Sequence, residues 1–255
     1  MNVFSPGFLS VLVGTAAFGL SAHSQFTFDM TTGGSGLTAN ATFQFDVVAD
    51  TVVQTAINPD DTNSLSISGS GGSFGAISST GTFEMTIVGL GDNDTAFNPV
   101  DWSGGSTGNF IETNNANGWG LNDGGGGLSI GAGEAIIFEF DTTNLNLVDG
   151  EFLAIVNTRV RDTSANLNLQ YRNVAGTPTT PIQIIDGSEF APGSSVIWPL
   201  NNREVLDGDQ FAFWAEGSGT KSLKDWQFVI VPEPSAYASL IGLGAFTLVL
   251  LRRRR

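Results

Sequence analysis

The chain has 255 residues but no cysteine, and it has a single histidine, His23. The lack of cysteine excludes thiol nucleophiles, disulfides and thiolate ligands, and one histidine leaves little for a serine–histidine triad or the usual zinc, copper and iron sites. Carboxylates are therefore the side chains left for acid–base chemistry. A domain of this kind must be held together by its hydrophobic core and by any ions that it binds.

Basic residues are also scarce, with 10 Lys and Arg against 25 Asp and Glu. Four of the ten bases are the last four residues, so the chain before them has six bases, 25 acids and a net charge of −19. Such a surface repels phosphate and attracts divalent cations, basic proteins or cationic polymers. We expect no nucleic-acid partner, and the acidic surface also serves solubility.

Helical periodicity is missing from the body of the chain, where apolar residues recur every second position. This alternation predicts half-buried strands, and more continuous apolar runs at 135–140 and 152–156 predict central strands. The alternating groups are Phe26, Phe28 and Met30; Phe43, Phe45 and Val47; Phe83, Met85 and Ile87; and Leu167, Leu169 and Tyr171. Further strands are expected near 51–57, 64–68, 182–185, 211–216 and 223–231.

Clusters of Gly, Asn, Asp and Pro separate these strands, as turns require. The sequence therefore predicts an all-β protein: an antiparallel β-sandwich with a jelly-roll-like arrangement, forming one domain over 25–230. Two smaller sandwiches divided at the Gly- and Asn-rich stretch 92–127 are the alternative. Trp226, Phe228 and Ile230 would share one face of the last strand.

Long apolar runs occur only at the two ends of the chain. Residues 8–20 form a short apolar stretch, and Ala22-His23-Ser24 offers the small-x-small pattern of signal peptidase sites, so cleavage before Gln25 is expected. The interpretation is a signal peptide over 1–24, although the first twenty residues hold no Lys or Arg. An uncleaved buried helix is the alternative. Cleavage would leave a mature protein with neither cysteine nor histidine.

At the other end, sixteen mostly apolar residues (236–251) follow a short proline motif and precede a basic cluster. A helix of this length reaches roughly 24 Å, a minimal membrane span. Four arginines would fix its end on the cytoplasmic side and stop transfer through the membrane. The motif residues are Val231, Pro232, Glu233, Pro234 and Ser235, and the cluster is Arg252, Arg253, Arg254 and Arg255.

This tripartite tail, over residues 231–255, resembles the PEP-CTERM sorting signal of Gram-negative bacteria. The resemblance implies that a membrane-embedded exosortase recognises the tail, cuts near Pro-Glu-Pro and passes the protein to the cell surface or extracellular polysaccharide matrix. It implies secretion with exosortase and signal peptidase as partners, and an inner-membrane anchor in transit. An ordinary tail anchor on a proline-stiffened stalk is the alternative.

One pair of carboxylates suits catalysis by spacing. Glu139 and Asp141 occupy alternate positions of one expected strand and so share a face, as the paired acids of a glycoside hydrolase would. The run resembles in part the E-x-D-x-x-E strand of laminarinase-like jelly-roll enzymes, but Asn144 stands where the third acid is needed. We therefore expect no catalytic residues and no enzyme.

Calcium is the candidate ion for an acidic chain rich in oxygen ligands. The strongest loop has Asp92, Asn93 and Asp94, with Asp101 downstream; other candidates are Asp60-Asp61 and Asp207 with Asp209. None has EF-hand or nonapeptide-repeat spacing. Asp and Asn also cap turns through their own backbone, which is the alternative interpretation.

Two tryptophans suggest carbohydrate binding. Trp102 and Trp119 lie in the Gly- and Asn-rich stretch, where an exposed indole could stack on a sugar ring beside Asp101 or the asparagines at 114, 115 and 117. A tryptophan folded back over the core is the alternative. The sequence predicts a structural or adhesive surface protein, with a noncatalytic carbohydrate-binding module as the second hypothesis and a carboxylate hydrolase as the third.

Overall fold

The computed structural model describes residues 26–30, 40–48, 51–56, 79–91, 96–104, 106–107, 110–113, 119–122, 130–148, 151–161, 166–173, 176–180, 182–185, 195–216 and 222–232. The regular structure in these ranges is β-strand, and the named strands pair antiparallel, which confirms the expected all-β class. The strand expected at 64–68, the signal segment 1–24 and the apolar segment 236–251 lie outside these ranges.

Within the part of the chain that the structure describes, no helix is long and apolar enough to span a membrane.

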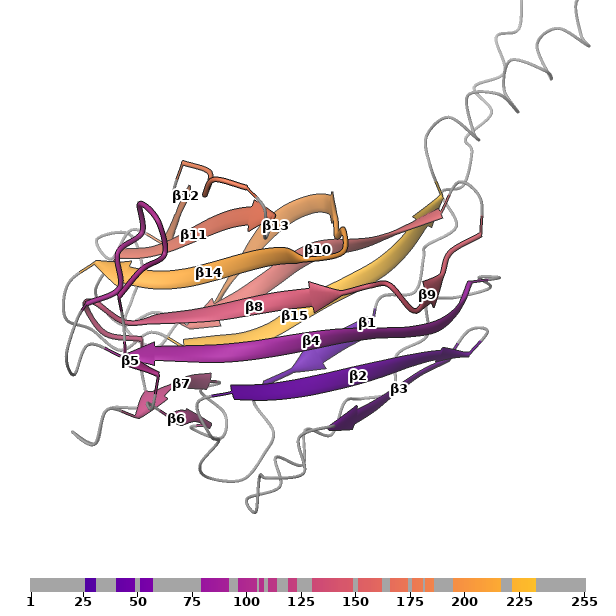
Figure 1. Cartoon of the computed structure of the whole chain (residues 1–255), viewed down its shortest axis with the longest axis horizontal. Helices are drawn as coiled ribbons and strands as arrows, with labels where there is room; N and C mark the ends of the chain where they lie inside the picture. Colours follow the sequence, from indigo (N-terminus) through magenta and orange to yellow (C-terminus); the bar gives the residue numbers. More distant parts are fainter. Residues whose placement is uncertain are drawn as a thin grey trace, which may run out of the picture.

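The strands form two sheets (Figure 1). The six-stranded sheet has the order β13-β10-β15-β7-β6, with β1 also paired to β15, and the nine-stranded sheet has the order β12-β11-β14-β8-β4-β2-β3, with β5 and β9 also paired to β4. In the first sheet the strands are β1 (Phe26–Asp29), β6 (Phe110–Thr113), β7 (Trp119–Asn122), β10 (Glu151–Arg161), β13 (Ser195–Glu204) and β15 (Ser222–Pro232). In the second they are β2 (Asn40–Val48), β3 (Thr51–Ala56), β4 (Thr80–Gly91), β5 (Ser106–Thr107), β8 (Ala135–Asp141), β9 (Leu145–Asn146), β11 (Asn166–Asn173), β12 (Ile182–Ile185) and β14 (Asp209–Glu216).

Strands from both sides of the stretch 92–127 enter both sheets. In the nine-stranded sheet β4 pairs with β8, and in the six-stranded sheet β1 pairs with β15, nearly 200 residues later in the chain. The two halves of the chain therefore share their sheets, unlike the two smaller sandwiches considered as an alternative. β8 lies between β14 and β4, and β10 between β13 and β15, as expected for the two most continuously apolar runs.

Alternation along the strands produces the core. In β4, Phe83, Met85 and Ile87 are fully buried, whereas the residues between them are half-buried on the opposite face. The same alternation in β2 and β1 confirms the period-two interpretation. The inner faces of the two sheets meet in one cluster of buried side chains, which we call the main core.

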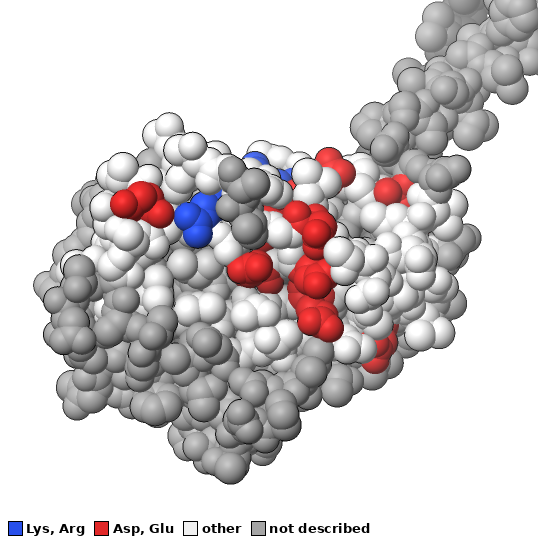
Figure 2. All heavy atoms as spheres, in the orientation of Figure 1, with Lys and Arg blue, Asp and Glu red and all other residues white. Residues whose placement is uncertain are grey.

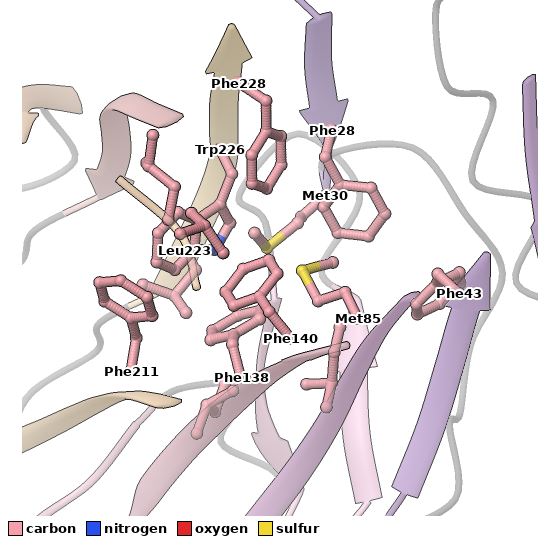
Figure 3. Close-up of a cluster of buried hydrophobic side chains, with 14 of the residues drawn as sticks. Phe28, Met30, Phe43, Met85, Phe138, Phe140, Phe211, Leu223, Trp226 and Phe228 are labelled. Atoms are coloured by element: carbon pink, nitrogen blue, oxygen red, sulfur yellow. The ribbon is translucent and has the colours of Figure 1, made fainter. Parts of the chain in front are cut away.

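Aromatic rings fill the centre of the main core (Figure 3). Trp226 of β15 meets Phe138, Phe140, Phe211 and Phe213 of the other sheet edge to face, with ring centroids 5.1–6.1 Å apart. Burial of each large side chain contributes about 1.5–3 kcal/mol before the entropy of ordering it is subtracted. With no disulfide available, these contacts hold the two sheets together.

The strand β13 was missed by sequence reasoning because Pro199 interrupts its apolar pattern and Asn201, Asn202 and Arg203 follow. The structure places it at the edge of the six-stranded sheet, where proline is tolerated. Asn201 and Asn202 adopt φ values of 55° and 54°, and two extra residues of β13 fall within the shifted register against β10. A proline and a bulge are devices that protect a sheet edge from pairing with other chains.

Candidate binding face on the nine-stranded sheet

Most residues of the expected sorting, cleavage and calcium sites lie outside the described ranges. They are Ala22, Ser24 and Gln25; Glu233, Pro234 and Ser235; Arg252, Arg253, Arg254 and Arg255; and Asp92, Asn93 and Asp94. Val231 and Pro232 are described and form the end of β15, opposite Phe152 and Glu151 of β10. The first residues of the expected sorting motif are therefore paired into a sheet.

A loop at residues 96–104 folds over the outer face of the nine-stranded sheet, the face turned away from the main core. Its backbone is held by hydrogen bonds that Phe97 N donates to Gly133 O (2.8 Å) and Trp102 N donates to Asn98 O (2.8 Å). Residues 98 and 103 also form an isolated antiparallel bridge. The loop is thus fixed both to itself and to the residues before β8.

Under this loop lies a second group of buried apolar side chains, which we call the loop-covered cluster. Sheet residues that point away from the main core supply most of it, and Phe97 and Trp102 cover them from the loop. Its members are Leu90, Phe97, Trp102, Ala135, Ile137, Ala212 and Trp214, with Val88 packed beside them. One end of the outer face is therefore apolar and covered, although outer faces of such sheets commonly meet water.

Trp102 is buried in this cluster, with 7% of its surface exposed. Its Nε1 donates to Gln170 Oε1 (3.1 Å), and the Arg172 guanidinium lies 4.3 Å from the centre of its ring. The ring therefore lies over the sheet, as in the alternative interpretation of this residue, and an arginine occupies one of its faces. The side chain of Trp119, the other expected sugar-stacking residue, lies outside what the structure describes.

The backbone of Trp102 has φ = 59°, in the left-handed region that bulky residues rarely adopt. Such a conformation costs on the order of 1–3 kcal/mol and persists where the surroundings impose it. The imposing contacts are the hydrogen bond to Gln170 and packing against the sheet. Gln170 in turn donates through Nε2 to Pro99 O and Thr179 O, both at 2.9 Å, so this one side chain ties the loop to β11.

Two buried donors on the outer face of the nine-stranded sheet lack acceptors among the described residues. They are Asn168 Nδ2, on a side chain 4% exposed, and Trp214 Nε1, on a side chain 9% exposed. The two residues are directly opposite each other on β11 and β14. A buried donor without an acceptor lowers the stability of the folded state by about 1–3 kcal/mol, so two adjacent ones are unusual in a sheet.

A row of polar side chains begins at Arg172, which contacts the loop, and crosses five neighbouring strands of the same face. The register places them opposite one another in the order Arg172, Gln210, Glu139, Thr86, Thr42. Arg172 Nε donates to Gln210 Oε1 (2.7 Å), Gln210 Nε2 donates to Glu139 Oε2 (2.5 Å), and the two threonine hydroxyls lie 3.0 Å apart. Neighbouring strands are about 4.8 Å apart, so the row presents polar groups at a regular spacing.

Carboxylates gather beside this row, as Figure 2 shows near the middle of the same face. Glu84 of β4 lies opposite Asp141, two register positions from the pair that contains Glu139, so the two acids selected from the sequence have a third near them on the neighbouring strand. Sequence reasoning missed Glu84 because the pairing of β4 with β8 is a long-range contact. Hydrogen bonds from the Thr143 hydroxyl and amide hold the pKa of Asp141 below its usual value.

Two of the acids considered for calcium, Asp101 and Asp209, accept hydrogen bonds from neighbouring residues. Asp101 Oδ1 accepts hydrogen bonds from the Ser103 hydroxyl (2.7 Å) and amide (3.0 Å), which lower its pKa. Asp209 accepts from Leu206 N, Tyr171 Oη and Asn173 Nδ2 and so closes its own turn. Within the described ranges no group of three or more acids is placed to hold a metal ion.

The outer face of the six-stranded sheet carries a different polar group. Asp225 is 2% exposed and forms an ion pair with Arg159, at 2.6 Å between Oδ2 and Nη2, while Asp29 lies opposite it on β1. Burial raises the pKa of Asp225; the Arg159 charge offsets part of the rise and the Asp29 charge adds to it. Asp225 Oδ1 has no hydrogen-bond donor among the described residues.

No protein-family model matches the chain, and neither a curated protein nor a solved structure is significantly similar to it.

Proposed function

We propose that this protein is an exported, surface-sorted component of the cell envelope or its polysaccharide matrix, with a structural or adhesive role. The folded part would be a jelly-roll-like β-sandwich over residues 25–230. The tail at 231–255 would be recognised by an exosortase after signal peptidase has removed residues 1–24, and its apolar segment would anchor the protein in the inner membrane in transit.

The observation that carries this proposal is the way the chain leaves the fold. β15 lies inside its sheet, paired along its length with β10 and on its other side with β1 and β7, and it ends at Pro232. Its inward side chains, Trp226, Phe228 and Ile230, are fully buried. Tension on the tail therefore acts along a strand whose hydrogen bonds must break together, which suits a domain attached to a surface through its C-terminus.

Cell fractionation tests the proposal in a Gram-negative host with and without an exosortase. The full chain should leave the inner membrane and reach the surface or medium only when the exosortase is present. Changing Pro232, Glu233 and Pro234 together to Ala should keep it in the membrane, while Val229→Ala, a substitution in the same strand before the motif, should not. Equal release with and without exosortase would refute the sorting proposal.

Noncatalytic carbohydrate binding is the second candidate, and the polar row from Arg172 to Thr42 favours it. Such a row offers donors and acceptors on a rigid sheet, as sugar recognition requires. It also includes Glu139, one of the two acids considered for hydrolysis, but there Glu139 accepts a hydrogen bond from Gln210 rather than standing free in a cleft. Hydrolysis is the weakest of the three candidates.

A further inference from the structure

We propose that the sheet surface under the loop 96–104 is a binding site for a neutral polysaccharide, and that the loop moves aside when the sugar binds. This inference rests on carbohydrate binding, the second function proposed above. It places the site on β11 and β14, around Asn168 and Trp214, rather than on exposed tryptophans in the Gly- and Asn-rich stretch.

Two unpaired hydrogen-bond donors are the first observation that supports a binding site here. Asn168 Nδ2 and Trp214 Nε1 come from directly opposed residues on adjacent strands, both buried, and neither meets an acceptor among the described residues. The unpaired indole N–H of Trp226 in the main core is a different case, because four phenylalanine rings surround it edge to face and an N–H can point at a ring. No described aromatic ring serves Trp214 in this way. Two adjacent donors on one surface match a ligand rich in acceptor oxygens.

The conformation of the loop 96–104 is the second observation that supports the proposal. Trp102 closes the loop in a left-handed backbone conformation, and the closed state also leaves the two donors unpaired. Both costs fall on the closed state and both disappear if the loop lifts and a ligand supplies acceptors. Strained conformations of this kind concentrate at binding sites for that reason.

The chemistry of the face narrows the ligand class. With the loop lifted, Trp214, Ile137 and Leu90 would form an apolar surface with an indole, which suits the C–H face of a sugar ring. The two donors would take ring or hydroxyl oxygens. Glu84, Glu139 and Asp141 lie on the same face and would repel an anionic polymer, so the ligand is an uncharged glycan.

The polar row would extend the binding surface across several strands. Gln170 and Arg172 follow Asn168 on β11 at two-residue steps on the same face. On β14, Gln210 lies four residues before Trp214, also on this face and opposite Arg172. A glycan chain crossing these strands would meet Asn168 and Trp214 first and then the row that ends at Thr42. A polymer, rather than a single sugar, fits a surface of this extent.

Affinity electrophoresis of the full chain in detergent-containing gels tests the site, with dextran and laminarin as neutral glucans and alginate as the anionic comparison. We expect one or both glucans to retard the wild-type chain and alginate to leave it unchanged. Trp214→Phe keeps an aromatic ring without the N–H, and Asn168→Leu removes the amide. Each should weaken glucan binding about tenfold, the loss expected for one good hydrogen bond.

The matched control is Trp198→Phe, which alters a half-buried indole of β13 in the other sheet and should leave binding unchanged. Phe97→Ala loosens the loop and should strengthen binding about threefold, because the closed state competes with the ligand. Thermal unfolding checks that each variant is folded. If Trp214→Phe does not fold, the proposal is tested with Asn168→Leu alone.

Three outcomes would overturn the inference: no retardation of the wild-type chain by either glucan, wild-type binding by both Trp214→Phe and Asn168→Leu, or equal retardation by alginate. These outcomes do not bear on the sorting proposal, because that proposal is tested by release of the protein from the inner membrane. Failure of carbohydrate binding as a function appears as no retardation at all, whereas a misplaced site appears as retardation that both variants retain.

Discussion

The two buried apolar clusters in the described residues differ in the elements that cover them and in the surroundings of their unpaired indole N–H groups. In the main core, strands cover both sides, and the one unpaired indole N–H lies among aromatic rings. In the loop-covered cluster, strands supply one side and a nine-residue loop supplies the other. It contains a left-handed tryptophan and the unpaired Trp214 Nε1, and the unpaired Asn168 Nδ2 lies on the neighbouring strand opposite Trp214. Buried apolar side chains are thus enclosed by strands in the main core and covered by a loop in the loop-covered cluster.

The difference follows from the elements that provide the cover. A strand in the main core is held by pairing along its length, as β15 is by β10 and β1, so its side chains cannot leave without breaking the sheet. The loop 96–104 is held by a few backbone hydrogen bonds and by Gln170. Segments with few such bonds open locally at lower free energy than the global unfolding of the domain.

Truncating one phenylalanine in each cluster should give the largest contrast. Phe228→Ala, in the centre of β15, should lower the free energy of unfolding by about 3–5 kcal/mol, because the strands around the cavity cannot collapse. Phe97→Ala should lower it by about 1–2 kcal/mol, because a loop can relax into the space. Urea unfolding of both variants measures the difference, and equal losses would show that the loop is as firmly held as the strands.

Two of the buried tryptophans, Trp226 and Trp214, should respond differently to replacement by phenylalanine. Trp226→Phe should destabilise the protein by about 1–3 kcal/mol, since it opens a void among four aromatic rings. Trp214→Phe should leave stability unchanged or raise it by up to about 1 kcal/mol, because it removes a donor that has no acceptor. Thermal unfolding checks both, and a loss at Trp214 as large as at Trp226 would mean that its N–H is well satisfied.

A smaller effect on stability is expected from Asp225, the buried carboxyl group on the outer face of the six-stranded sheet. Its folded-state pKa is raised, so the folded state binds its proton more tightly and stability falls as pH rises from about 3.8 through that raised pKa. Asp225→Asn should therefore be more stable than wild type at pH 7, by about 1 kcal/mol or less, with the gap closing toward pH 3. A gap that widens on acidification would show that Arg159 stabilises the charged form overall.

Much of the main core could be predicted from the sequence, because period-two patterns at Phe26, Phe43 and Phe83 report directly on which side chains point inward. The continuous runs at 135–140 and 152–156 likewise indicated strands inside the sheets. β13 escaped prediction because its pattern is broken by Pro199 and by two residues that form a bulge. Its place depends on pairing with β10, which no local pattern reveals.

The loop-covered cluster was beyond sequence reasoning for a similar reason. Leu90, Ile137 and Trp214 occupy positions that the alternation assigns to the outer face, so their burial depends on a loop that returns over the sheet. Trp102 could be recognised as a loop residue that either faces solvent or folds back, but only the three-dimensional structure decides between these. The C-terminal tail, by contrast, could be interpreted from the sequence, because its signal consists of the order and spacing of neighbouring residues. Its function in sorting remains a prediction.

Hydrogen–deuterium exchange of the full chain, with and without a glucan (dextran or laminarin) that retards it, tests the central claim that the loop opens independently of the sandwich. The amides of Phe97, Asn98 and Trp102, all hydrogen-bonded in the closed loop, should exchange much faster than those of Trp226 and Phe228 in β15. The bound glucan should change exchange in the loop and at β11 and β14 and leave β15 unaffected. Loop amides as protected as β15, or indifferent to the glucan, would contradict the account.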